Sequence, residues 1–75
     1  MTTLDAKGLL CPLPVLKARK ALKAMAAGEV LEILATDKGA PKDFVAFCDT
    51  TGDELLESRE EADGTLFFRI RKRGR

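Results

Sequence analysis

Apolar residues recur at helical spacing in two segments of the chain. In residues 12–27 they fall on one face at about 100° per residue, with lysines opposite, and Gly28 stands where a helix commonly ends. A second helix is predicted over residues 41–50, because its apolar positions are spaced i, i+3, i+4. The two apolar faces consist of Val15, Ala18, Leu22 and Met25, and of Phe44, Phe47 and Cys48.

Four further segments have the composition of β-strands. Residues 29–36 are mostly apolar and β-compatible, which favours a central strand, and residues 2–5 form a shorter one. Residues 54–59 and 65–71 flank an Asp-Gly pair that is typical of a hairpin turn. The order βαβαββ predicts an α+β two-layer sandwich, with two helices packed on one face of a four-stranded mixed sheet. We expect residues 1–75 to form a single domain.

Composition limits the function classes. Of the 75 residues 45% are hydrophobic, which is typical of a globular domain, and the net charge of +1 gives no global attraction to nucleic acid. No apolar run approaches the ~18 residues that would span a bilayer. The two cysteines form no disulfide framework and no signal-peptide pattern precedes them. We therefore expect a cytoplasmic protein that binds no membrane.

The sequence contains no histidine, which excludes Cys-His and Ser-His-Asp catalysis. Two distant cysteines cannot complete a tetrahedral zinc site, so no metal is expected. No Cys-x-x-Cys pair and no glycine-rich phosphate loop is present, so no cofactor is expected either. Of the candidate functions, a stand-alone thiol peroxidase or reductase is the least favoured, because it would lack a general base and an adjacent resolving cysteine.

The segment Gly8-Leu9-Leu10-Cys11-Pro12-Leu13-Pro14 joins the first strand to the first helix. Prolines are tolerated in the first turn of a helix, where their missing N–H groups would be unsatisfied anyway. Cys11 is therefore predicted to be the N-cap residue or its neighbour, with Pro12 at the first helical position. Free N–H groups and the helix dipole favour a thiolate there, and such sites lower a thiol pKa from ~8.5 to ~3.5–7.5. We expect Cys11 to be reactive and Cys48, on an apolar helix face, to be core.

The stretch from Leu4 to Pro14 resembles the signature of the TusA/SirA-like family of small sulfur-carrier proteins. The resemblance extends over nearly the whole chain. Two positions depart from the family pattern: Phe44 stands where an aliphatic residue is usual, and Asp53 stands where a histidine is common. The other matching positions are Thr36-Asp37, Asp43-Phe44, Phe47-Cys48, Gly52 and Leu55.

The resemblance implies a sulfur carrier in which Cys11 holds sulfur as a persulfide, with Pro12 and Pro14 shaping the thiol motif. It implies a cysteine desulfurase or another protein as sulfur donor, and a sulfur-relay or tRNA-thiolating protein as acceptor. Such a carrier is a sulfurtransferase with little or no turnover of its own, and we expect a monomer. The pathway stays open between tRNA modification, cofactor sulfuration and sulfur oxidation.

Two surfaces are candidates for partner contacts. Leu13 and Leu16 fall on the lysine side of the first helix and suggest an apolar docking surface beside the thiol; alternatively, Leu13 folds back over Leu9 or Leu10. The lysines of the first helix, Lys17, Lys20 and Lys23, form either a charged rim of that surface or an ordinary solvated face. The alternative function is a small regulatory or RNA-binding module that uses these lysines and the basic C-terminus, although direct nucleic-acid binding is not expected. The basic residues are Lys17, Lys20 and Lys23, and Arg69, Arg71, Lys72, Arg73 and Arg75.

Overall fold

The computed structural model describes residues 2–74 of the chain. It contains two helices and four strands in the predicted order βαβαββ. Neither helix has the length and apolar character needed to cross a membrane, within these residues. The elements are β1 (Thr2–Ala6), α1 (Leu13–Lys23), β2 (Val30–Ala35), α2 (Ala40–Thr51), β3 (Glu54–Glu60) and β4 (Leu66–Arg71).

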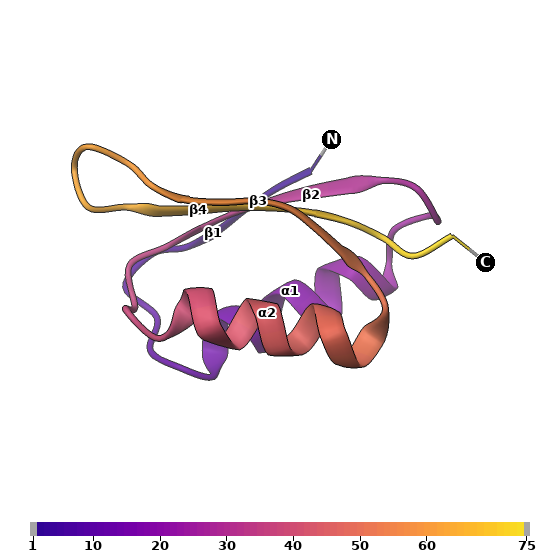
Figure 1. Ribbon diagram of the computed structural model, residues 1–75, viewed down its shortest axis with the longest axis horizontal. Helices are drawn as coiled ribbons and strands as arrows, with labels where there is room; N and C mark the ends of the chain where they lie inside the picture. The colour runs from indigo at the N-terminus through magenta and orange to yellow at the C-terminus, as the bar shows by residue number, and fades with distance from the viewer. Residues whose placement is uncertain (1, 75) are drawn as a thin grey trace.

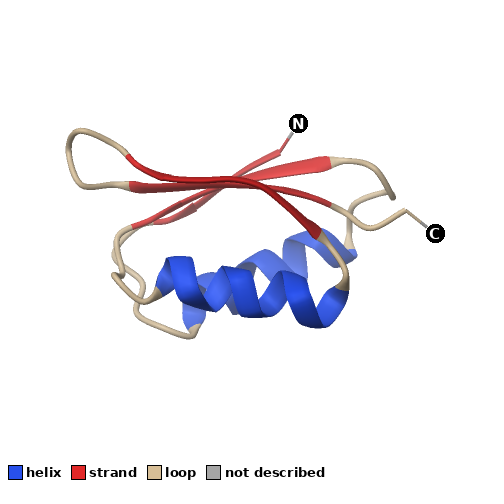
Figure 2. Cartoon of the chain, in the orientation of Figure 1, coloured by secondary structure: helices blue, strands red, loops and turns tan. Residues whose placement is uncertain are grey.

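The strands form one mixed sheet in the order β1-β2-β4-β3. β1 and β2 are parallel and are joined through α1, whereas β4 runs antiparallel to both β2 and β3. Both helices lie on the same face of this sheet (Figure 1; Figure 2). The predicted α+β sandwich is therefore confirmed.

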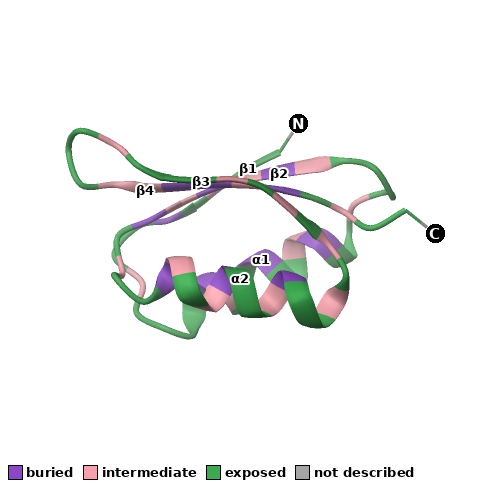
Figure 3. Ribbon diagram, in the orientation of Figure 1, coloured by how far each residue is buried: buried purple, intermediate pink, exposed green. Residues whose placement is uncertain are grey.

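The buried positions lie on β1, β2, β4 and both helices (Figure 3). Phe44 of α2 is fully buried, and its ring centroid lies 4.6 Å from that of Phe68 on β4. Burying large apolar side chains between two layers is the main stabilising contribution available to so short a chain. The core contains Ala6, Ala18, Leu22, Leu31, Ile33, Ala35, Ala40, Phe44, Cys48, Phe68 and Ile70.

The outer face of the sheet carries charged side chains over one aromatic ring. Phe67 is 8% exposed, and the guanidinium carbon of Arg59 lies 4.3 Å from its ring centroid. Arg69 lies over the same ring and pairs with Glu32 at 3.0 Å. These arginines cover the aromatic ring with their planar groups, so the ring is shielded from solvent although it lies on the outer face.

The first helix is shorter than its periodicity predicts. It ends at Lys23 and not near residue 27. The Glu29 side chain accepts the Ala26 N–H at 2.7 Å, and the Lys72 ammonium group donates to the Met25 carbonyl. Because these contacts hold the following residues in a turn, the helix stops before the position that Gly28 marks. Gly28 has a φ of +87° and leads into β2.

Candidate functional site

Two side-chain hydrogen bonds hold the start of the loop between β1 and α1. The Asp5 carboxylate accepts the Lys7 N–H at 3.0 Å, and this bond lowers the pKa of Asp5. Gly8, with a φ of +82°, donates its N–H to the Thr36 hydroxyl at the end of β2 at 2.9 Å. Asp5 is thus a structural acceptor that holds the start of the loop. The loop places Cys11 at the start of α1.

The two prolines start the helix as predicted, but Pro12 lies one position before the predicted place. Pro12 is the N-cap residue and Pro14 occupies the second helical position, so the helix begins at Leu13, one residue later than expected. Cys11 is the residue before the cap, and the Cys11–Pro12 peptide bond is cis. Pro14 is buried. The motif therefore starts the helix as its proline content predicts, shifted by one residue.

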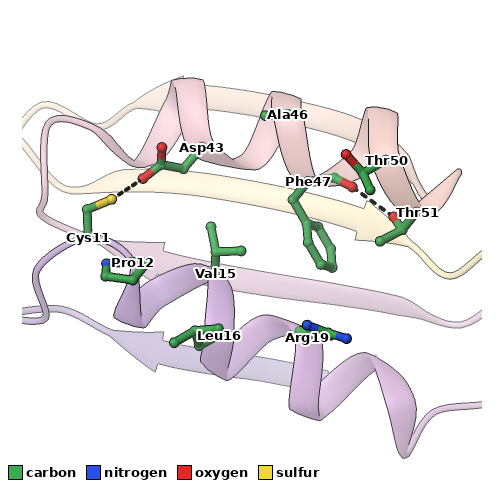
Figure 4. Close-up of a pocket in the computed structure, with 10 residues that line it drawn as sticks. All are labelled: Cys11, Pro12, Val15, Leu16, Arg19, Asp43, Ala46, Phe47, Thr50 and Thr51. Atoms are coloured by element: carbon green, nitrogen blue, oxygen red, sulfur yellow. Dashed lines mark hydrogen bonds between the residues drawn. The ribbon is translucent and has the colours of Figure 1, made fainter.

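Cys11 is exposed and faces the start of α2 (Figure 4). Its thiol donates a hydrogen bond to Oδ2 of Asp43, with the two atoms 2.6 Å apart. A carboxylate oxygen of Asp37 lies close by, so that the sulfur and both carboxylates fall within 4.8 Å of one another. Nothing beyond this proximity points to an ion, so we assign no metal to the trio. Two acidic groups surround the thiol.

The prediction that the Cys11 thiol has a lowered pKa is wrong. The hydrogen bond to Asp43 raises the pKa, because the carboxylate stabilises the protonated thiol and repels a thiolate; the charge of Asp37 acts in the same direction. The prolines that start the helix also remove backbone donors. Pro12 and Pro14 have no N–H, and the Leu13 N–H is bonded to the Leu10 carbonyl at 2.8 Å. The helix start therefore offers a thiolate few of the donors that the prediction assumed.

An open groove of about 460 Å³ runs between α1 and α2 from the thiol. Cys11 and Asp43 lie at one end of it, and Arg19 lies toward the other (Figure 4). Val15 points from α1 toward α2, and Phe47 points from α2 toward α1. The groove walls are thus mostly apolar, with charged groups at both ends.

Exposed leucines lie along the chain on either side of the thiol. Leu13 and Leu16 are 47% and 49% exposed, which confirms their predicted exposure, and Leu13 does not fold back into a covered position. Leu10, in the loop, is 70% exposed and was not predicted as part of this surface. The lysines of the predicted rim are exposed as well. They are Lys17, Lys20 and Lys23.

Cys48 lies in the core, as predicted from its place on the apolar face of α2. It is 7% exposed, and burial raises the pKa of its thiol to about 11. A thiol that is both covered and protonated is a poor nucleophile. Cys11 is therefore the accessible thiol of the two.

The described basic residues of the C-terminus make contacts within the chain. Four of its five basic residues are described, and Arg75 lies outside the described residues. A phosphate backbone would have to compete with these contacts, which weakens the RNA-binding alternative. Arg69 pairs with Glu32 and Glu57, Arg71 with Glu54, the Lys72 ammonium group with the Met25 carbonyl, and the Arg73 N–H with the Asp53 carboxylate.

Sequence reasoning gave no role to Asp37, Asp43 or Arg19. The first two stand at positions that match the family pattern, and this match was the available signal. Thr36, another matching position, fastens the thiol loop. The two departures from the pattern also have structural roles, since Phe44 packs on Phe68 and Asp53 accepts the Arg73 N–H at 2.8 Å. No pattern marked Arg19 for the groove.

The chain is similar to known proteins in sequence and in fold. Residues 2–72 match the family described as Sulfurtransferase TusA, and the chain belongs to this family. The chain is 56% identical to the sulfur carrier protein TusA of Allochromatium vinosum over 69 residues, covering 92% of this chain and 90% of that protein. It is 48% identical to TusA of Pseudomonas entomophila over 71 residues, covering 95% and 88%. The crystal structure of a SirA-like protein from Desulfitobacterium hafniense superposes with a TM-score of 0.85 at 30% identity, covering 97% and 99%.

The protein is thus a sulfur carrier, as the resemblance implied. A carrier exchanges sulfur with a donor and an acceptor, so it has partners of both kinds.

Proposed function

We propose that Cys11 carries the sulfur as a persulfide. The observation that supports this role most is its accessibility: Cys11 is exposed at the mouth of a groove, whereas Cys48 is buried. In loading, the Cys11 thiolate attacks the outer sulfur of a donor persulfide. A bond forms between that sulfur and Sγ, the donor's S–S bond breaks, and the donor cysteine leaves as a thiolate. The exchange needs no external oxidant or reductant.

The donor in this proposal is a cysteine desulfurase, and the acceptor is a sulfur-relay or thiolating protein. Leu10, Leu13 and Leu16 provide an apolar centre for their docking, and the lysines of α1 provide a positive rim that suits an acidic partner surface. The carrier works as a monomer in the cytoplasm, where thiols stay reduced. Because both partners need the same thiol, they bind the same surface in turn.

A loading assay tests the proposed function. The purified protein is incubated with a cysteine desulfurase and cysteine, and its intact mass is measured. We expect the gain of one sulfur atom per chain, reversed by a thiol reductant and released as thiocyanate by cyanide. A chain that gains no sulfur while the desulfurase turns over would exclude this role.

Leu16→Ala is expected to weaken donor binding through faster dissociation. Truncating an apolar anchor in a docking surface commonly costs ~1–2 kcal/mol or more. Binding kinetics with the desulfurase measure the effect. Leu56→Ala removes a leucine of similar exposure (42%) from β3 and should leave affinity unchanged. Equal losses in the two variants would contradict the assigned surface.

Lys20→Glu is expected to slow association with an acidic partner and to leave dissociation nearly unchanged. Rim charges act mainly through electrostatic steering, and salt screens them. The association rate of Lys20→Glu should therefore be lower than that of the wild type at low salt, and the two rates should converge at high salt. A slower rate that persists at high salt would mean that Lys20 makes a direct contact instead.

A further inference from the structure

The contact between Cys11 and Asp43 joins two elements that are distant in sequence. Asp43 stands in the first turn of α2, whose N-cap residue Gly39 has no side chain to cap the helix. A carboxylate near such a start could bind its free N–H groups. Among the hydrogen bonds of residues 2–74, however, the Asp43 carboxylate takes part only in the one with the Cys11 thiol. Its contact is directed at the sulfur.

The charges around the sulfur are mostly negative. Asp43 approaches it from α2, and Asp37 approaches it from the turn between β2 and α2. On α1, Arg19 lines the same groove, but it follows Cys11 by about two helical turns. The exposed Lys17 does not contact the thiol in this structure. No positive group pairs with the sulfur among the described residues.

We propose that Asp43 is a positioning residue that keeps the thiol of the free carrier protonated and directed into the groove mouth, until a docked partner pairs with its carboxylate. The partner group that fits this role is a lysine or arginine side chain, because the site presents two carboxylates at the sulfur. Pairing withdraws the carboxylate from the thiol, whose proton then passes to solvent. The resulting thiolate is the attacking group.

The Asp43 carboxylate also acts when the loaded carrier delivers its sulfur, an inference that rests on the proposed function. When an acceptor attacks the outer sulfur of the loaded carrier, the bond to Sγ breaks and Cys11 leaves as a thiolate. A negative neighbour makes that leaving group poorer, and sulfur is transferred more slowly from such a thiol. Small thiols in solution do not dock on the carrier, so they hold no cation against Asp43. Asp43 thereby favours delivery to a docked protein over loss to free thiols.

Asp43→Asn tests the proposal through the pH dependence of Cys11 alkylation by iodoacetamide, followed at the peptide level. We expect the wild-type midpoint to lie above ~8.5, the ordinary value for cysteine. The variant midpoint should be lower and its rate at neutral pH severalfold higher. The plateau of its alkylation rate at high pH should not exceed that of the wild type, because a thiolate of lower pKa is intrinsically less nucleophilic. Loss of structure alone would not raise the rate at neutral pH while leaving the plateau at high pH no higher.

Two matched variants serve as controls. Asp49→Asn removes the same charge from an exposed position on the same helix and should leave the Cys11 profile unchanged. Asp43→Glu keeps the charge and should keep the midpoint above that of Asp43→Asn. The proposal is overturned if the wild-type and Asp43→Asn profiles coincide, if Asp49→Asn shifts the midpoint equally, or if the wild-type midpoint lies at or below the ordinary value.

A second readout follows sulfur loss from the loaded protein to glutathione. Both proteins are first loaded by the desulfurase, and we expect Asp43→Asn to lose its sulfur severalfold faster than the wild type. Equal loss rates would contradict the restraining role. Alkylation involves no sulfur donor, so the first experiment can fail while loading succeeds. The two proposals therefore fail separately.

Discussion

Cys11→Ser is expected to abolish sulfur loading completely while the protein stays folded. A hydroxyl cannot form a persulfide, and Cys11 is exposed, so the substitution leaves no cavity in the core. Loading with desulfurase and cysteine is measured by intact mass, and the fold is checked by circular dichroism. We expect no added sulfur and a melting curve close to that of the wild type.

Cys48→Ser is the matched control for this experiment. It should load fully but melt at a lower temperature, because a buried hydroxyl without a partner costs ~1–3 kcal/mol. Cys48 is 7% exposed within the core cluster. Full loading of Cys11→Ser, or loss of loading in Cys48→Ser, would reverse the assignment of the two thiols.

Phe44→Ala is expected to remove much of the stability of the domain. Truncating a buried phenylalanine costs ~3–5 kcal/mol, and a chain of this length has roughly 4–11 kcal/mol in total. Phe44 is fully buried and packs on Phe68, so the substitution would also remove an aromatic contact. Urea unfolding measures the effect. The sequence has no tryptophan or tyrosine, so far-ultraviolet circular dichroism is the suitable probe.

Val45→Ala is the control on the neighbouring residue. Val45 is 49% exposed on α2, and surface changes of this kind usually stay within ~0.5 kcal/mol. A similar loss in both variants would contradict the assigned role of core packing, because alanine is the better helix former at either position. A small loss in Phe44→Ala would show that the sheet tolerates the cavity by collapsing onto it.

The fold could be predicted because its signals are local. The period of the apolar residues separates helices from strands, and Asp63-Gly64 marks the hairpin. The end of α1 could not be predicted this way. It depends on Lys72, which reaches the Met25 carbonyl from the opposite end of the chain. Contacts between residues that distant leave no periodic pattern in one sequence.

The parts of the site that depend on local signals could be predicted, and the parts that depend on distant contacts could not. Cys11 and its helix start follow from the two prolines, and the exposure of Leu13 and Leu16 follows from the helical wheel. The direction of the thiol pKa does not, because it depends on Asp43, which only the packing of α2 brings to the sulfur. A helix start predicts a stabilised thiolate when its donors are free and no acid lies nearby. Neither condition holds here.

The central claim is that Cys11 alone carries the sulfur, and peptide mapping of the loaded wild-type protein tests it most directly. The protein is loaded by a desulfurase, alkylated under non-reducing conditions, digested and analysed by mass spectrometry. We predict one added sulfur atom on the peptide that contains Cys11, absent after reduction, and an unmodified peptide around Cys48. Sulfur on Cys48, or on neither cysteine after active turnover of the donor, would contradict the account.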